Sequence, residues 1–255
     1  MTGASKGIGK TIALALAEAG AWVAVNYNRD GDGARDAVNA IVTGGGEAYA
    51  VQADISAPDN VARMFGALKK CFYLPDILIN NAGISPVKRL VDYSMEQIAA
   101  IVNTNLLGAM YCSKMALPHM IESQWGRIVN ISSLHSVSTN MGRIPYAASK
   151  GGMNAMTRAL AVEYARDGVR INCLIVGCIA TERTSGVISD ELAVWEARVP
   201  MGRWGAGREV ADAALYLCSE SSSYINGACL TVDGGFTCRF SEPDVPFAEQ
   251  KMPYE

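Results

Sequence analysis

Short apolar runs alternate with longer helical patterns along almost the whole chain. The runs are rich in valine and isoleucine, and several are apolar almost throughout, as strands buried on both faces are. Strands that alternate with helices form a parallel sheet covered by helices on both faces and joined by right-handed crossovers. The sequence therefore predicts a doubly wound α/β fold. The expected strands are Ala21–Asn26, Glu47–Gln52, Asp76–Asn80, Arg127–Ser132, Val169–Val176 and Ala228–Asp233.

The segments between these strands repeat apolar residues at helical spacing. In the first segment Ile8, Ile12 and Leu16 recur on a single face. Neither an internal repeat nor a linker divides the chain, so we expect one domain over residues 1–238. A polar, proline-containing tail over 239–255 is expected to pack on a neighbouring copy or to fray. The expected helices are Gly7–Ala19, Ala34–Thr43, Pro58–Cys71, Met95–Met120, Tyr146–Arg166, Ser189–Arg198 and Arg208–Ser219.

The composition excludes several classes of protein. Half of the residues are hydrophobic and 18% are charged, which is incompatible with a disordered, coiled-coil or collagen-like chain. The net charge is −3, so the chain has no basic excess to neutralise phosphates, and no nucleic-acid partner is expected. No apolar run approaches the roughly 18 residues that a membrane span requires, so we expect no membrane insertion.

The cysteines and histidines argue against a metal site. The seven cysteines are scattered without a C-x-x-C pair, and neither His119 nor His135 has a sequence neighbour suited to zinc. Cysteines in such a pattern pack as small hydrophobic side chains and stay reduced, which is typical of a cytoplasmic protein. The sequence therefore predicts a cytoplasmic protein without a metal.

A glycine-rich turn, Thr2–Gly9 (TGASKGIG), stands directly before the first expected helix. Glycines let the backbone approach a ligand, and the amides of a helix N-terminus then face a phosphate group. A plain structural turn has the same pattern. In a nucleotide-binding fold a strand precedes this turn, but the sequence starts at Met1. We therefore expect the first strand to be absent from this chain, through a misplaced start or a truncation.

The end of the second expected strand carries information about a nucleotide. A carboxylate there binds the ribose of NAD(H), whereas the extra phosphate of NADP(H) needs cations. The chain has no acid at the strand tip, and it offers Arg29 there and Lys6 in the glycine turn. This pattern favours NADP(H). Asp30 and Asp32 follow closely, so NAD(H) stays possible.

Tyr146 and Lys150 stand four residues apart at the start of an expected helix. Side chains at this spacing share one helix face, and an ammonium lowers the pKa of a neighbouring phenol from its reference value of about 10. Such a pair suits proton transfer, although the bare pattern also occurs on helix surfaces. Ser133 follows the expected strand Arg127–Ser132, at the sheet edge where ligands bind.

The whole series of motifs resembles the short-chain dehydrogenase/reductase family, a Rossmann-type fold, from Thr2 to about Gly235. The matching features keep the order and the spacing of the family. They are the TGASKGIG turn, Asp54, Asn80–Gly83 (NNAG), Asn105, Ser133, Tyr146 with Lys150, Val176–Thr181 and Val232–Gly235.

This resemblance implies a role for individual residues. Tyr146 is implied to be the general acid in reduction and the base in oxidation, and Lys150 to lower its pKa. Ser133 is implied to polarise the substrate carbonyl, and Asn105 to hold a water in a proton relay. The residues implied to bind the coenzyme, apart from Tyr146 and Lys150, are Gly3, Ser5, Lys6, Ile8, Asp54, Ile55, Asn81, Gly83, Ile179 and Thr181.

The expected function is hydride transfer between a nicotinamide coenzyme and a ketone or secondary alcohol, such as a 3-oxoacyl thioester, a sugar, a steroid or a cyclic alcohol. A catalytically silent nucleotide-binding regulator is the alternative. The segment Glu182–Trp204 is expected to cover the substrate, and His135 either lines the pocket or lies on a surface loop. The resemblance implies a homotetramer that pairs the helices Met95–Met120 and Tyr146–Arg166, with a dimer as the alternative.

Overall fold

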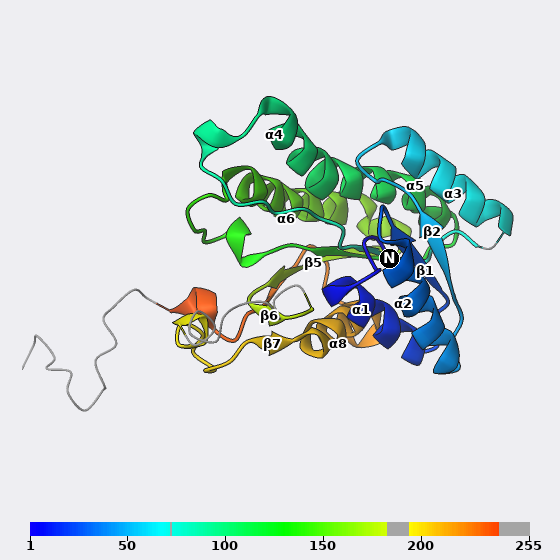
Figure 1. Cartoon of the computed structure of the whole chain (residues 1–255). Coiled ribbons are helices and arrows are strands. Elements are labelled where there is room, and N and C mark those ends of the chain that lie inside the picture. Colours follow the sequence, from blue (N-terminus) through cyan, green and yellow to red (C-terminus); the bar gives the residue numbers. More distant parts are fainter. Residues whose placement is uncertain (72, 183–193, 240–255) are drawn as a thin grey trace, which may run out of the picture.

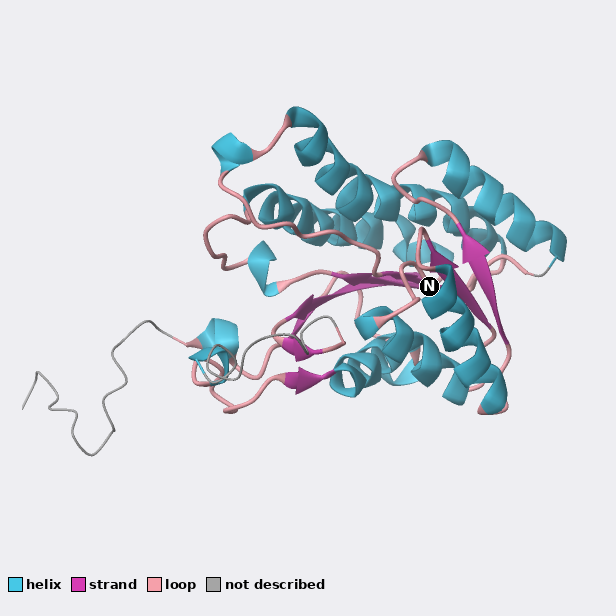
Figure 2. Ribbon diagram, viewed as in Figure 1, coloured by secondary structure: helices cyan, strands magenta, loops and turns pink. Residues whose placement is uncertain are grey.

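The computed structural model of the chain describes residues 1–71, 73–182 and 194–239. Parallel strands form a central layer between two layers of helices, as Figures 1 and 2 show. Every expected strand is present within two residues of its expected bounds. These strands are β1 (Val23–Tyr27), β2 (Ala48–Gln52), β3 (Ile77–Asn80), β4 (Gly126–Ile131), β5 (Val169–Val176) and β8 (Cys229–Val232).

The strands pair in the orders β2–β1 and β3–β4–β5–β8, all in parallel. The first residues of the chain join these two groups. The backbone of Asn26 in β1 donates to Met1 O at 3.0 Å and accepts from Ala4 N at 2.9 Å, while Thr2 N donates to Ile79 O of β3 at 3.0 Å. Met1–Ala4 thus supply hydrogen bonds to both groups of strands, between β1 and β3.

The helices lie in two layers. One face of the sheet carries α1, α2 and α8, and the other carries α3, α4, α5 and α6 (Figure 1). Their bounds are α1 (Gly7–Glu18), α2 (Gly31–Thr43), α3 (Pro58–Cys71), α4 (Met95–Val102), α5 (Gly108–Glu122), α6 (Ile144–Tyr164) and α8 (Gly207–Cys218).

Each helix layer forms its own hydrophobic core with the sheet. Ile12 and Leu217 pack with Leu174 on one face, and Phe65 packs with Ile128 on the other. Every residue of β4 and β5 is buried. The two central strands are buried on both faces, which explains why their sequences are apolar almost throughout.

The structure corrects the prediction of one helix over Met95–Met120. A five-residue π-helix, η2 (Asn103–Leu107), separates α4 from α5. Its centre is Asn105, which is fully buried and hydrogen-bonded to a neighbouring loop. Local helix periodicity contains no information about such a contact, so the widened turn was not predicted.

Other differences lie at the ends of elements. The helix α2 starts earlier than expected because the Asp30 side chain caps it, accepting from Gly33 N at 3.2 Å. Two short strands that were not predicted, β6 (Ile179–Ala180) and β7 (Gly205–Ala206), pair with each other. Residues 189–193 of the expected helix 189–198, residues 183–193 of the expected substrate cover 182–204 and the tail after residue 239 lie outside the described residues. Within the described part of the chain, no helix is long and apolar enough to span a bilayer.

Candidate active site

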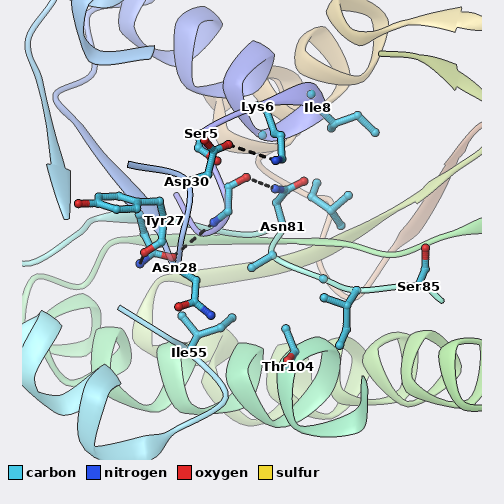
Figure 3. Close-up of a pocket in the computed structure, with 18 of the residues that line it drawn as sticks. Ser5, Lys6, Ile8, Tyr27, Asn28, Asp30, Ile55, Asn81, Ser85 and Thr104 are labelled. Carbon is cyan, nitrogen blue, oxygen red and sulfur yellow. Dashed lines mark hydrogen bonds and ion pairs between the residues drawn. The ribbon is translucent and has the colours of Figure 1, made fainter. Parts of the chain in front are cut away.

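A cavity of about 740 Å³ lies where the parallel strands end. Its walls come from the glycine turn and from the loops that follow β1 to β5. In Figure 3 side chains from these loops surround one space, with Tyr27 and Asn28 on one side and Ile8 and Ser85 on the other. Ligands of open α/β sheets bind at this edge, and the volume is that of a small-molecule site.

Most of the residues that were predicted for the site line this cavity. They are Gly3, Ser5, Lys6, Ile8, Arg29, Asp54, Ile55, Asn81, Gly83, Ser133, Tyr146, Lys150 and Thr181. Asn105 and Ile179 do not line it. Asn105 is buried in η2, and Ile179 is buried in β6.

The glycine turn is closed tightly by its own backbone and by the loop after β3. A Cβ atom on Gly9 would lie 2.2 Å from Gly3 O and 2.5 Å from Asn81 Nδ2. The Asn81 amide donates to Thr2 O at 3.1 Å and to Gly3 O at 2.8 Å, which holds the turn against the sheet. The helix α1 then starts without an acidic residue in its first turn, so its amides give this part of the cavity a positive potential.

The charges beside the glycine turn are more balanced than the sequence suggested. Lys6 Nζ lies 3.2 Å from Asp30 Oδ2, a pair that Figure 3 shows at the cavity wall. The Lys6 ammonium and the Gly33 backbone N–H lower the pKa of Asp30. Arg29 lines the same region and is exposed. The position of Asp30 as the cap of α2 was the sequence signal that could have placed its carboxylate here.

Lys150 lines the cavity and is only 3% exposed. Its Nζ donates to Ile131 O at 2.6 Å and lies 5.9 Å from the centre of the Tyr146 ring. Burial lowers the pKa of Lys150 from 10.5 to about 8. The ammonium is therefore close to the phenol and is still mostly protonated at neutral pH.

Ser133 directly follows the last paired residues of β4 and is buried at the cavity wall. Its backbone is extended, and its Oγ accepts a hydrogen bond from His135 N at 3.3 Å. Because the oxygen accepts this bond, the hydroxyl proton stays available for a ligand in the cavity.

Asn105 connects the π-helix to the loop after β3. Its Oδ1 accepts from Ile84 N at 2.8 Å, and its Nδ2 donates to Ile84 O at 3.0 Å and to Ser149 Oγ at 3.1 Å. A Cβ atom on Gly83 would lie 3.2 Å from Asn105 Oδ1 and 3.8 Å from Lys150 Nζ. Asn105 and Lys150 thus both approach the space that a side chain at Gly83 would fill.

Other cavity residues were not predicted. Tyr27, Asn28, Ser85 and Thr104 line the wall. Ser85 lies in a loop without a motif, and its carbonyl accepts from Arg143 Nη1 at 2.7 Å. Thr104 reaches the cavity from the π-helix, where the relation between sequence position and helix face departs from the ordinary period.

Comparison with known proteins agrees with this geometry. The family model described as enoyl-(acyl carrier protein) reductase matches residues 3–237. The chain belongs to the short-chain dehydrogenase/reductase family. It is therefore an NAD(P)-dependent oxidoreductase with a single Rossmann-type domain.

Several members of the family are similar to this protein over nearly their whole length. Glucose 1-dehydrogenase 2 of Bacillus subtilis is 36% identical over 240 residues, which cover 93% of each chain. A 3β-hydroxysteroid dehydrogenase of Eggerthella lenta is 38% identical over 93% of this chain and 92% of its own. The crystal structure of a gluconate 5-dehydrogenase from Burkholderia cenocepacia, in complex with NADP and tartrate, superposes with a TM-score of 0.87 at 33% identity, covering 94% of both chains.

Proposed function

We propose that this short-chain dehydrogenase/reductase transfers a hydride between NADP(H) and a ketone or secondary alcohol, with Tyr146 as the general acid and base. The observation that carries the proposal is the buried Lys150 ammonium, 5.9 Å from the Tyr146 ring centre, in a cavity that Ser133 also lines. The three groups together supply a proton donor, the charge that tunes it and a second hydrogen-bond donor for one carbonyl oxygen.

The cavity fits a dinucleotide. Its wall runs without interruption from the glycine turn and Asp54 to Tyr146 and Thr181. A Cβ atom on Gly7 would have no neighbour closer than 3.8 Å, so the space beside the turn is open to a phosphate. When it is bound, the coenzyme supplies or accepts the hydride. Gly3, Ser5, Lys6 and Ile8 would hold its pyrophosphate, and Lys150 its ribose hydroxyls.

The proton chemistry follows from the charge on Lys150. A phenol with a pKa of about 10 is a weak acid at neutral pH, and the nearby ammonium stabilises its anion. During reduction Tyr146 donates its proton to the carbonyl oxygen, while the Ser133 hydroxyl donates a hydrogen bond to the same oxygen. During oxidation the phenolate takes the proton from the alcohol.

Asn105 has a supporting role in this proposal. Its side-chain carbonyl oxygen and the Lys150 ammonium both lie near the place that a Cβ atom on Gly83 would take. A water held there would pass protons from solvent to Lys150 and so restore the Tyr146 proton. Ile179 and Thr181 would orient the carboxamide of the nicotinamide ring.

The assay that tests the function follows NADPH and NADH absorbance at 340 nm with sugars, aldonic acids, steroids, 3-oxoacyl thioesters and cyclic ketones. We expect activity on at least one class, and Tyr146→Phe should reduce kcat by about three orders of magnitude because it removes the proton donor. The Kd of the Tyr146→Phe protein for NADPH should stay close to that of the wild type. Unchanged activity of Tyr146→Phe would contradict the assigned role of Tyr146, whereas a wild-type protein that binds NADPH and acts on none of these substrates would support a nucleotide-binding regulator.

The preference for NADP(H) rests on Arg29. Asp30 is paired with Lys6, so Arg29 is the cation that we assign to the 2′-phosphate. Arg29→Ala should raise KM for NADPH at least about tenfold and leave KM for NADH nearly unchanged. Arg35→Ala is the matched control, because Arg35 pairs with Asp32 on the exposed side of α2. Equal effects on both coenzymes would contradict the assignment.

The homotetramer remains part of the proposal. The helices α5 and α6 expose Met110 and Val162, which are 42% and 84% accessible. A Cβ atom on Gly151 of α6 would have no neighbour closer than 3.9 Å, so a helix of another copy can approach there, whereas Gly152 packs against Leu106 of its own chain. Light scattering coupled to gel filtration should give the mass of four chains, and the mass of one chain would refute the assembly.

A further inference from the structure

His135 contacts both of the side chains to which we assign proton and hydrogen-bond donation. We propose that His135 is a positioning residue that keeps the Tyr146 phenol and the Ser133 hydroxyl aimed at the same substrate oxygen. This inference rests on the proposed function of Tyr146 and Ser133. It adds a residue that the family resemblance did not imply.

The imidazole packs directly against the phenol. The two ring centres are 5.7 Å apart and their planes are inclined by 74°, which is an edge-to-face contact. Lys150 Nζ lies 5.9 Å from the centre of the same Tyr146 ring. Tyr146 therefore lies near the ammonium to which the proposed function assigns the tuning of its acidity, and it is in contact with a ring that restricts its rotation.

A hydrogen bond fixes the orientation of the imidazole. His135 Nδ1 lies 3.0 Å from Thr139 Oγ1, and the Thr139 hydroxyl donates to Asn140 O at 3.3 Å. Because that hydroxyl has one proton, its oxygen accepts from Nδ1–H. His135 is thus assigned the tautomer with the proton on Nδ1, and this bond locks its ring plane.

Hydrogen bonds connect the turn that contains His135 to Ser133 and to α6. Its N–H donates to Ser133 Oγ at 3.3 Å, within the short 3₁₀ turn η3 (Leu134–Ser136). Ser136 Oγ donates to Ser133 O at 2.6 Å and accepts from Asn154 Nδ2 at 2.9 Å. Since Asn154 belongs to α6, the turn is tied to the helix that carries Tyr146.

The surroundings keep the imidazole neutral. His135 is partly buried, and burial lowers its pKa, which the Arg143 guanidinium lowers further. Arg143 is the charged group that acts on the imidazole, and the Lys150 ammonium lies near the same Tyr146 ring. A second positive charge against the phenol is therefore disfavoured, and the ring acts through packing and not as an acid.

Kinetics of matched variants test the positioning role. His135→Phe keeps a flat ring without the Nδ1 bond, and His135→Ala removes both. We expect kcat to fall about threefold in His135→Phe and about tenfold or more in His135→Ala, with KM for NADPH unchanged. The isotope effect with deuterated NADPH should become larger, because misplacement of the donors slows the chemical step. His119→Ala is the control. The only other histidine of the chain pairs with Asp76 at 2.9 Å and should leave kcat unchanged.

A double-mutant cycle separates positioning from simple packing. Thr139→Val should lower kcat about as much as His135→Phe, and the double variant should be no worse than either, because both remove the same anchor. Additive losses would overturn the proposal. So would losses of His135→Ala confined to KM.

A spectroscopic measurement distinguishes this inference from the proposed function. With two histidines in the chain, His119→Ala assigns the remaining imidazole Cε1–H signal to His135. The ring current of Tyr146 should displace that signal, and Tyr146→Leu should move it towards the free-histidine position. An unmoved signal refutes the positioning role whether or not activity is found. A wild-type protein without oxidoreductase activity on any substrate refutes the proposed function itself.

Discussion

Burial of the Lys150 ammonium lowers the free energy of unfolding of the protein. The ammonium is withdrawn from water and donates to Ile131 O and to the Met153 sulfur atom. The resulting shift of its pKa from 10.5 to about 8 corresponds to about 3 kcal/mol of unfavourable burial at neutral pH. The same burial strengthens the interaction with Tyr146, because the interior screens charges less than water does.

Replacing Lys150 with methionine should therefore give a more stable and inactive protein. The lost hydrogen bond to Ile131 O offsets about 1 kcal/mol of the gain, so Tm at pH 7 should rise by about 2–6 °C. The folded pKa lies below the unfolded one, so between about pH 8 and 10.5 the unfolded state binds more protons. Wild-type stability rises through this window, and the difference between the two proteins should shrink.

Thermal unfolding at pH 7 and pH 10 provides this comparison. Lys114→Met is the control, since Lys114 is exposed on α5 and its replacement should give no such pH dependence. A Lys150→Met protein that melts below the wild type at pH 7 would contradict the assigned cost of burial.

At the scale of elements, the effect of replacing a glycine depends on the atoms that lie beside it. Gly9 sits where the turn folds back on Gly3, and Asn81 closes the remaining space. Gly66 lies in α3 with nothing within 4 Å of the place a Cβ would take. The same substitution at these two helical positions should therefore have opposite effects.

Gly9→Ala should abolish coenzyme binding and lower the free energy of unfolding, because the new Cβ meets backbone that cannot move aside. Gly66→Ala should stabilise the protein by about 0.5–1 kcal/mol, since alanine costs less backbone entropy in a helix. Urea unfolding and titration with NADPH measure both effects. The prediction fails if Gly9→Ala binds NADPH as the wild type does.

At the scale of the whole molecule, the two groups of strands meet at the first residues of the chain. Thr2 is buried at this junction, and its Oγ1 accepts from Asn81 N at 2.9 Å and from Ala82 N at 3.1 Å. These bonds connect the glycine turn to the end of β3. They keep the two halves of the cavity in a fixed relation.

Thr2→Val should loosen this junction without changing the volume of the side chain greatly. Two partly buried N–H groups lose their acceptor, which should lower the free energy of unfolding by about 1–3 kcal/mol. Amide exchange at Asn81 and Ala82 should accelerate in the folded state. The control is Thr11→Val, whose hydroxyl bonds within α1 to Gly7 O and should matter less. Unchanged exchange rates would show that these bonds do not hold the junction.

The strands and most of the site were predictable from the sequence because they depend on local patterns. Buried strands such as β4 and β5 need apolar residues at every position, and the turn Thr2–Gly9 needs small residues at fixed spacing. Tyr146 and Lys150 share a helix face by their spacing alone. These patterns involve residues that are close in the sequence, so they can be recognised without knowledge of the tertiary structure.

Tertiary packing decided the remaining features, because they join residues that are distant in the sequence. Asn105 widens its helix to reach Ile84, and Lys6 is paired with Asp30 across the glycine turn. The contact between His135 and Tyr146 exists only because the turn after β4 folds onto α6. Hydrogen bonds and ring contacts form wherever the fold brings partners together, and no local pattern specifies the distance between them.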